Sequence, residues 1–164
     1  MHIHQYERYY MVAIGVTLGV FFASVLAAGL VFGIEPAQPG GFINPQLLGE
    51  TEFANPGLRD MGDNHYDAYI VAQMWAFDTG SDEANDVGVD VLRIPQGSEV
   101  TFYIASRDIT HGVLIEYHNL NLQLVPGHIA SGTITFDRPG HFRAICHEYC
   151  GQAHHNMNFE IIVE

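Results

Sequence analysis

The longest apolar run of the chain extends from Tyr9 to Ile34, near the N-terminus, and contains no charged residue. As a helix it exceeds the roughly 20 residues that are needed to cross the hydrocarbon core of a bilayer. Tyr6 and Tyr10 lie at one end of the run, where aromatic side chains commonly occupy the membrane–water interface. A cleaved signal peptide is the alternative, but its apolar region usually has only about 7–15 residues before a small-residue cleavage site. The pattern therefore favours a retained transmembrane helix over residues 1–34.

The next segment, residues 35–64, shows little periodicity and holds four of the seven prolines of the chain. These prolines are Pro36, Pro39, Pro45 and Pro56. The segment is longer than an ordinary loop within a domain, and proline favours extended backbone. We therefore expect residues 35–64 to form a linker, or an extended segment that lies on a neighbour.

From residue 65 to the C-terminus, short runs alternate between apolar and polar residues, as half-buried β-strands do. The alternation is clearest over Glu99–Ser106, where Val100, Phe102 and Ile104 share one face. The expected strands cover residues 66–77, 87–94, 99–106, 119–124, 133–136, 141–145 and 158–163, with turns at Pro95-Gln96-Gly97, Pro126-Gly127 and Pro139-Gly140. Seven or eight short strands in this span predict an antiparallel β-sandwich, so the fold is expected to be mainly β.

The charged residues lie almost wholly in the part of the chain that follows the apolar run. The sequence has 19 acidic residues against 6 basic ones, all arginine, which gives a formal net charge of −13. Residues 35–164 carry 18 of the acids and 5 of the arginines, so this charge belongs to the part outside the membrane. Such acidity excludes direct binding of nucleic acid, which requires a basic face. An apolar content of 48% with 12% aromatic residues excludes intrinsic disorder.

Both cysteines lie in one stretch between the last two expected strands, which reads C-x-x-x-C-x-x-x-H-x-x-M and contains Cys146, Cys150, His154 and Met157. Two thiols, an imidazole and a thioether are soft-to-borderline donors, which favour copper over the hard cations magnesium and calcium. A disulfide between the cysteines is feasible, but it would leave the histidine and the methionine unexplained. The spacing of the stretch favours His154 over its neighbour His155 as a donor.

A copper site of this kind needs a further imidazole from another part of the chain. His111 closely follows the expected strand 99–106, and loops from different strands cluster at each end of a sandwich. The other histidines are more typical of surface or hydrogen-bonded positions. His111 is therefore the candidate for the additional ligand.

Together these residues resemble subunit II of the heme-copper terminal oxidases over nearly all of residues 65–164. The motifs that carry the resemblance are Trp75-Ala76-Phe77, Ile94-Pro95-Gln96-Gly97, Asp108-x-x-His111, Pro126-Gly127, Arg138-Pro139-Gly140 and Cys146-x-Glu148-x-Cys150-Gly151-x-x-His154-x-x-Met157. The resemblance implies that residues 65–164 form a cupredoxin-like Greek-key β-sandwich, which carries a dinuclear copper A centre. The single expected membrane helix is similar to the B-type, or cytochrome b-a type, oxidases, whose subunit II has one such helix.

The resemblance also implies which residues hold the two copper ions. These are His111, Cys146, the backbone carbonyl of Glu148, Cys150, His154 and Met157. By resemblance the two cysteines bridge the ions, the first histidine and the methionine bind one copper, and the second histidine and the carbonyl bind the other. Trp75 marks the place where electrons enter, and Phe77 is a second candidate for that role.

By the same resemblance, the chain accepts electrons from cytochrome c or a small blue-copper protein and passes them to the hemes of subunit I. Subunit I contains heme and copper B and reduces oxygen to water, so the whole complex is a cytochrome-c oxidase. The chain is then expected in the cell membrane as a single-pass protein, with its C-terminal domain on the extracytoplasmic side. Its acidity suits either the docking of a lysine-rich donor or adaptation to salt.

A membrane-anchored blue-copper electron carrier is the alternative function. Its mononuclear site uses one cysteine, two histidines and a weak methionine, so the second cysteine, Cys150, argues against it. The copper A domain of a nitrous-oxide-type reductase would require a large further catalytic domain. Subunit II of a quinol oxidase keeps the fold but lacks the copper ligands, all of which are present here.

Overall fold

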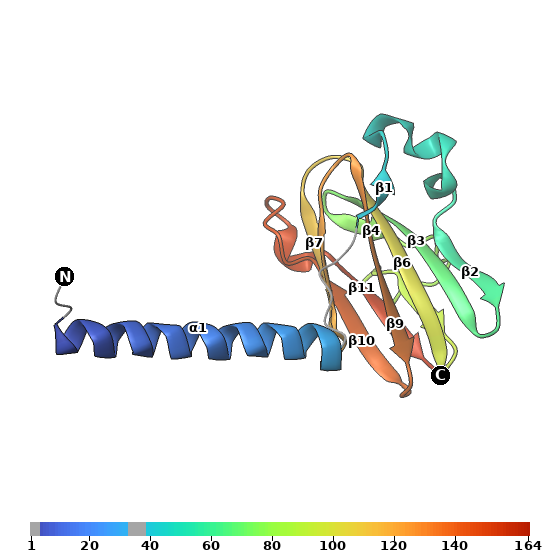
Figure 1. Cartoon of the computed structure of the whole chain (residues 1–164). Coiled ribbons are helices and arrows are strands. Elements are labelled where there is room, and N and C mark those ends of the chain that lie inside the picture. Colours follow the sequence, from blue (N-terminus) through green and yellow to red (C-terminus); the bar gives the residue numbers. More distant parts are fainter. Residues whose placement is uncertain (1–3, 33–38) are drawn as a thin grey trace. The chain divides into compact units, whose positions relative to one another are not determined.

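The computed structural model describes residues 4–32 and 39–164, which belong to two separate units (Figure 1). The first unit contains α1 (Gln5–Phe32), a helix of 28 residues that buries none of its side chains within the chain. By length and apolar composition, α1 could cross a membrane. This agrees with the uncharged run in the sequence, although Ile34, its last residue, lies outside the described residues.

The second unit consists of two packed β-sheets (Figure 1). The strands are β1 (Pro39–Phe42), β2 (Gly57–Gly62), β3 (His65–Gln73), β4 (Ala76–Asp78), β5 (Val91–Ile94), β6 (Ser98–Ser106), β7 (His111–Ile115), β8 (Leu120–Leu124), β9 (His128–Phe136), β10 (Gly140–Ile145) and β11 (Asn158–Val163). The larger sheet has the order β1-β9-β6-β3-β2, with β4 paired to β3, and the smaller sheet has the order β5-β11-β10-β7-β8. The predicted mainly-β sandwich with one N-terminal apolar helix is therefore confirmed.

The main hydrophobic core lies between the two sheets. Alternate side chains of β6 are fully buried in it, and Phe159 of β11 packs edge-on against Phe77 of β4, with ring centroids 5.4 Å apart. Cys146, Cys150 and Met157 belong to the same buried cluster. The sulfur-bearing residues are thus part of the packed core, which fixes their positions more firmly than an exposed loop would.

A second buried cluster lies on the opposite face of the larger sheet. Val71 of β3 and Ala105 of β6 alternate with inward-facing neighbours, and they contact Leu48 and Phe53. The last two residues come from the 3₁₀ helices η1 (Pro45–Glu50) and η2 (Glu52–Ala54). Thr51 caps η2, since its hydroxyl accepts a hydrogen bond from the backbone N–H of Phe53.

The prediction of a linker over residues 35–64 needs correction for its described part. β1 pairs with β9, and β2 pairs with β3, so residues 39–64 complete the larger sheet and its outer cluster. Sequence periodicity does not reveal this role, because the prolines and short 3₁₀ helices bury only two large side chains, Leu48 and Phe53, without a regular spacing. Residues 35–38 lie outside the described residues.

Four further features differ from the sequence prediction. The sheets are not purely antiparallel, because β3 pairs with β6 and β5 pairs with β11 in parallel. The single strand expected over residues 66–77 is broken at Met74 and Trp75, and β4 folds back antiparallel on β3. β7 was not predicted, and β5 begins at Val91 rather than at Val87. The strands β6, β8 and β11 are confirmed.

Candidate metal centre

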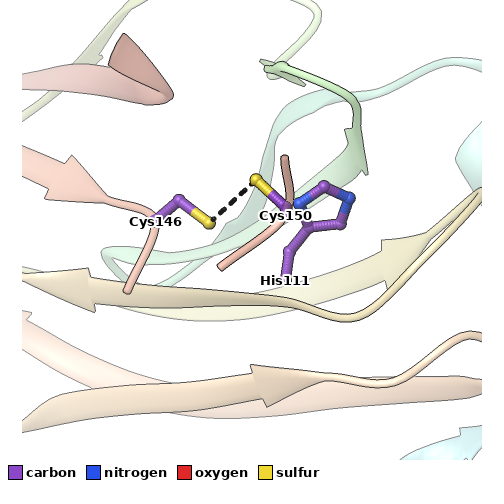
Figure 2. A group of neighbouring side chains, drawn as sticks. All are labelled: His111, Cys146 and Cys150. Atoms are coloured by element: carbon purple, nitrogen blue, oxygen red, sulfur yellow. Dashed lines mark hydrogen bonds between the residues drawn. The ribbon is translucent and has the colours of Figure 1, made fainter. Parts of the chain in front are cut away.

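Three buried side chains meet at one end of the sandwich: His111 at the start of β7, Cys146 directly after β10, and Cys150 (Figure 2). Their ligand atoms all lie within 4.8 Å of one another. Both cysteines are free thiols, with their Sγ atoms 3.8 Å apart, so they do not form the disulfide that the sequence left open. A histidine and two thiols so close together in a packed core are typical of a site for a soft metal ion.

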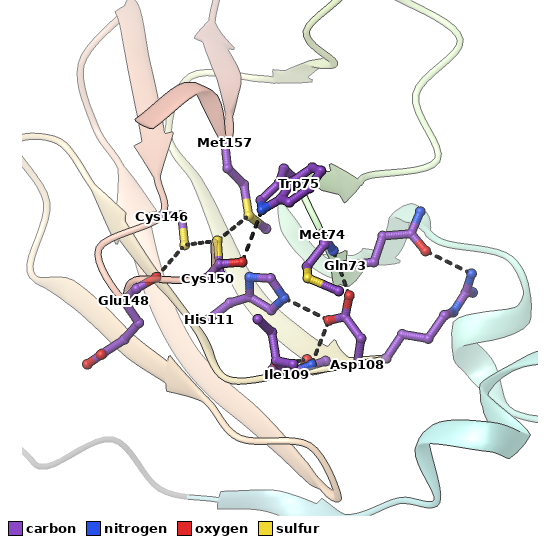
Figure 3. Close-up of polar contacts among 12 residues, drawn as sticks. Gln73, Met74, Trp75, Asp108, Ile109, His111, Cys146, Glu148, Cys150 and Met157 are labelled. Carbon is purple, nitrogen blue, oxygen red and sulfur yellow. Dashed lines mark hydrogen bonds and ion pairs between the residues drawn. The ribbon is translucent and has the colours of Figure 1, made fainter. Parts of the chain in front are cut away.

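The loop between β10 and β11 brings the remaining predicted donors to the same place, and Figure 3 shows Glu148 and Met157 among them. The Sγ of Cys150 lies 3.5 Å from Nδ1 of His154 and 3.6 Å from Sδ of Met157. The Sγ of Cys146 lies 3.3 Å from the backbone carbonyl oxygen of Glu148. The base of the loop is closed by a hydrogen bond of 3.0 Å from the Cys146 N–H to the Met157 carbonyl. All the residues that the sequence named as ligands therefore gather at one site.

The structure distinguishes between the two adjacent histidines of the loop. His154 directs Nδ1 toward the thiol of Cys150, whereas His155 is exposed. Both belong to the short 3₁₀ helix η3 (His154–Asn156), whose turn points the two side chains in different directions. The spacing argument that favoured His154 agrees with this geometry.

His111 has one of its ring nitrogens held and the other free. Its Nε2 lies 2.8 Å from Oδ1 of Asp108, while its Nδ1 is buried and has no hydrogen-bond partner among the described residues. Buried polar atoms are normally paired, so an orphaned imidazole nitrogen beside two thiols requires an explanation. A bound metal ion supplies it, because metal-ligating histidines commonly donate their second N–H to a carboxylate.

Asp108 connects His111 to an exposed aromatic residue. Its carboxylate also accepts hydrogen bonds of 2.7 Å from the backbone N–H groups of Met74 and Ile109. In the turn that contains Met74, the Trp75 indole N–H donates to the Cys150 carbonyl at 3.0 Å. One carboxylate thus fixes both a candidate ligand and the turn that carries the indole (Figure 3).

The two aromatic residues proposed for electron input differ in exposure. Trp75 is 41% exposed and packs on Gly151, where φ is +118° and an added Cβ would lie 2.9 Å from the indole nitrogen. Phe77 is only 3% exposed and lies in the core against Phe159. Phe77 therefore presents no surface to a partner, and Trp75 is the remaining candidate.

The two thiols have different pKa values. Burial alone would raise the pKa of Cys146, but the adjacent imidazole of His111 and the Gly112 N–H outweigh it and lower the pKa to about 6. Burial and the nearby charge of Cys146 raise the pKa of Cys150 to about 11. At neutral pH the pair therefore carries one thiolate and one thiol, and full ionisation requires a cation to replace the second proton.

The acid–base state of His111 and Asp108 is set by the same contacts. Burial opposes the charged form of His111, yet the adjacent Cys146 and Asp108 outweigh it and raise the pKa of the imidazole. Burial would raise the pKa of the Asp108 carboxyl, but the hydrogen bonds that this carboxylate accepts outweigh the effect and lower the pKa. Asp108 is thus ionised at neutral pH and remains a hydrogen-bond acceptor.

One residue of the site was not found from the sequence. Gly112 follows His111, and a Cβ at this position would overlap the ring of His147. The imidazole of His147 therefore packs directly on the backbone of β7. No pattern marked this close contact, because it depends on how β7 and the β10–β11 loop come together.

A β-sandwich with two thiols, two imidazoles and a thioether at one end, preceded by an apolar helix long enough to cross a membrane, is typical of a membrane-anchored copper protein. Residues 47–164 match the sequence model of the family described as cytochrome c oxidase subunit II, periplasmic domain. The chain belongs to the family of cytochrome c oxidase subunit II.

Individual relatives agree with this assignment. Cytochrome c oxidase subunit 2 from one strain of Thermus thermophilus is 31% identical over 159 residues, which are 94% of this chain and 83% of the relative. A second protein of that name from Thermus thermophilus is 32% identical over 152 residues, or 90% of this chain and 98% of the relative. A chain of a heme-copper terminal oxidase dimer, solved by cryo-electron microscopy, has a TM-score of 0.80 and 30% identity and covers 98% of this chain and 100% of its own length.

Family membership makes the chain subunit II of a heme-copper oxidase, and its role in electron transfer follows from the family. The β domain is cupredoxin-like, the family binds copper, and the chain contains a buried histidine and cysteine cluster that could hold a metal ion. One N-terminal apolar helix and a domain that matches the family's periplasmic domain fit a single-pass membrane protein.

Proposed function

We propose that this chain receives the electrons of the oxidase complex at a dinuclear copper A centre. Cytochrome c or a small blue-copper protein delivers the electrons, and the hemes of subunit I receive them. Subunit I, which also contains copper B, reduces oxygen to water. The observation that carries the proposal is the second buried thiol, Cys150, which lies 3.8 Å from Cys146 and within reach of further donors on both sides.

The donor set fits two copper ions. Cys146 and Cys150 would hold both ions, His111 and Met157 would hold one of them, and His154 with the Glu148 carbonyl would hold the other. Glu148 belongs to this set only through its backbone carbonyl oxygen, which lies 3.3 Å from the Sγ of Cys146. A thiolate-bridged copper pair supplies one-electron redox chemistry in which the charge is shared between two ions, so each changes its geometry little.

The protein contributes rigidity and the exclusion of water. The loop that carries most of the ligands is anchored by β10 and β11, and the Cys146 N–H to Met157 carbonyl hydrogen bond closes its base. Asp108 fixes the tautomer of His111, so that Nδ1 is free to bind. Ligands held in this way change position little when the charge of the site changes, which favours fast electron transfer.

Electrons enter through Trp75 in this proposal. Its indole is partly exposed to solvent, and its N–H is hydrogen-bonded to the carbonyl of the candidate ligand Cys150. A donor protein that contacts the indole is therefore separated from the site by a single hydrogen-bonded residue. The chain lies in the cell membrane as a single-pass protein, with α1 as the anchor and the β domain on the extracytoplasmic side.

The alternative is a blue-copper carrier with one copper ion per chain, and copper analysis distinguishes the two. We expect the purified, copper-loaded chain to hold about two copper ions. The Cys150→Ser variant should hold at most about one and should lose electron transfer from cytochrome c, because it lacks the second bridging sulfur. His155→Ala, next to the ligand His154 but exposed, should keep the full copper content. A wild-type chain with one copper and a blue chromophore would instead support the carrier.

A further inference from the structure

The chemistry of the surface around Trp75 indicates what kind of donor it fits, and this inference rests on the proposed function. Met74, Trp75 and Ile109 form what we call the Trp75 patch, and their side chains are 48%, 41% and 37% exposed. Asp108 brings the two segments together, since it accepts hydrogen bonds from the N–H groups of Met74 and Ile109 (Figure 3). The patch is thus an apolar surface that is rigidly built around the indole.

Two charged residues, Arg107 and Asp108, directly precede Ile109 of the patch. The Asp108 side chain is 25% exposed, and its oxygens accept hydrogen bonds from two backbone N–H groups and from His111, so part of its charge is already compensated. Arg107, the preceding residue, is exposed, and its guanidinium donates to the side-chain oxygen of Gln73 at 3.0 Å.

Arg107 differs from the other exposed arginines of the β domain. Arg93, Arg138 and Arg143 pair with carboxylates at 2.7, 3.8 and 3.1 Å. Within residues 4–32 and 39–164, no carboxylate forms such a pair with Arg107. A chain of net charge −13 therefore carries at Arg107 a cation without a carboxylate partner, and the guanidinium is held by Gln73, two residues before Trp75 in the sequence.

We propose that the electron donor meets the Trp75 patch with an apolar face that carries carboxylates at its rim, and that the donor is acidic rather than lysine-rich. A carboxylate of the donor would pair with Arg107, whereas a lysine would meet a like charge there. The net acidity of the chain does not oppose this contact at physiological ionic strength. The screening length is then about 8 Å, so charges that line the contact outweigh distant ones.

The test uses the purified oxidase complex and two forms of a single donor. One form is a lysine-rich, mitochondrial-type cytochrome c, and the other is the same protein with its lysines succinylated, which turns each ammonium into a carboxylate. Two quantities are measured at an ionic strength of about 0.15 M, where distant charges are screened. They are the Kd of each oxidised probe and the second-order rate at which each reduced probe reduces the copper centre.

We expect the succinylated probe to bind the wild-type complex more tightly and to react faster. Arg107→Gln should weaken binding of this probe roughly threefold and Arg107→Glu roughly tenfold, with the opposite change for the lysine-rich probe. The backbone N–H of Arg107 bonds to the Ala72 carbonyl, and this contact remains when the exposed side chain is replaced.

Arg138→Glu is the matched control, because it changes the net charge by the same amount. Arg138 is exposed and precedes β10, whereas Cys146 follows that strand at its other end. This variant should leave the ratio of the two Kd values unchanged within about twofold.

The inference is overturned if the lysine-rich probe binds the wild-type complex more tightly, or if Arg138→Glu shifts the ratio as much as Arg107→Glu does. It is also overturned if neither probe binds. Failure of the proposed function has a different signature: the copper content is wrong and no reduced probe reduces the centre, whatever residue occupies position 107. The Kd ratio is measured on oxidised probes and does not depend on turnover.

Discussion

The larger sheet carries a hydrophobic cluster on each of its faces, and the two clusters serve different purposes. The cluster between the sheets includes Cys146, Cys150 and Met157, so the packing that stabilises the fold also positions the sulfur donors. The cluster on the outer face joins Leu48 and Phe53 to the sheet and contains none of the candidate ligands. Loss of packing should therefore affect copper on one face of the sheet and only stability on the other.

Two phenylalanine truncations test this difference most strongly. Phe53→Ala in the outer cluster and Phe159→Ala in the main core each remove a buried ring, which should lower the free energy of unfolding by about 3–5 kcal/mol. Only Phe159→Ala should also shift the copper absorption spectrum, because this residue lies two positions after Met157 on β11. Denaturant unfolding and visible spectra of the copper-loaded chain measure the two effects. A changed copper spectrum in Phe53→Ala would show that the faces are not independent.

Replacement of Asp108 should have the next largest effect, because its side chain supports only the end of the core that carries the candidate ligands. Asp108→Ala removes the acceptor for His111 Nε2 and for two backbone N–H groups, and we expect copper affinity to fall about 10–100-fold. Competition with a copper chelator measures the affinity. Asp137→Asn, an exposed acid in the β9–β10 turn, is the control and should change nothing. Equal affinities for Asp108→Ala and the wild type would refute the positioning role.

Trp75→Ala should separate donor contact from the copper site itself. An exposed aromatic residue at the centre of a contact commonly contributes tenfold or more to affinity, so we expect the Kd of the donor to rise about tenfold. The copper content should be unchanged, because the indole contacts the Cys150 carbonyl rather than a donor atom. Tyr117→Ala is the control and should leave the Kd of the donor unchanged. Tyr117 is an exposed tyrosine that follows the C-terminal end of β7, whereas His111 begins this strand. A lower copper content in Trp75→Ala would instead show that the indole is needed for copper binding.

The smallest effect is a shift in the titration of the two thiols of the metal-free chain. Cys146 has a pKa lowered to about 6, so its thiolate should form as pH rises through that value, whereas Cys150 should ionise only near 11. The lowered pKa of Cys146 stabilises the fold at pH values above the ordinary thiol pKa, and this stabilisation is lost as pH falls through 6. The raised pKa of Cys150 stabilises the fold at pH values below the ordinary thiol pKa, and this stabilisation is lost as pH rises through 11. Ultraviolet thiolate absorbance measures both steps, and Cys150→Ser should remove the upper one. A single step near the ordinary thiol pKa would contradict the coupling.

The strands that sequence analysis predicted best are those with one face in the core and one in solvent. Alternation marked β8 and β11 because only every second side chain is buried, and it marked the first seven residues of β6 for the same reason, although Ala105 and Ser106 at its end are buried as well. β7 escaped detection because its first three residues are all buried, so that no alternation appears. The parallel pairing of β3 with β6 could not be predicted either, because the two strands are distant in the sequence and no turn motif between them determines how they pair.

The ligand residues could be predicted from one motif, but the contacts that support them could not. β3 and β6 run parallel and end on the pair Ala72 and Ser106, so the residues that follow each strand lie side by side. This places the Asp108 carboxylate against the Met74 N–H. The antiparallel arrangement expected from the sequence would have put these segments at opposite ends of the sheet.

The central claim is that two thiolates are shared between two copper ions, and electron paramagnetic resonance of the oxidised, copper-loaded chain tests it directly. With a single copper isotope, the account predicts the hyperfine pattern of one unpaired electron that is shared equally by two copper nuclei. A pattern from a single copper nucleus, in a chain with its full copper content, would contradict the account.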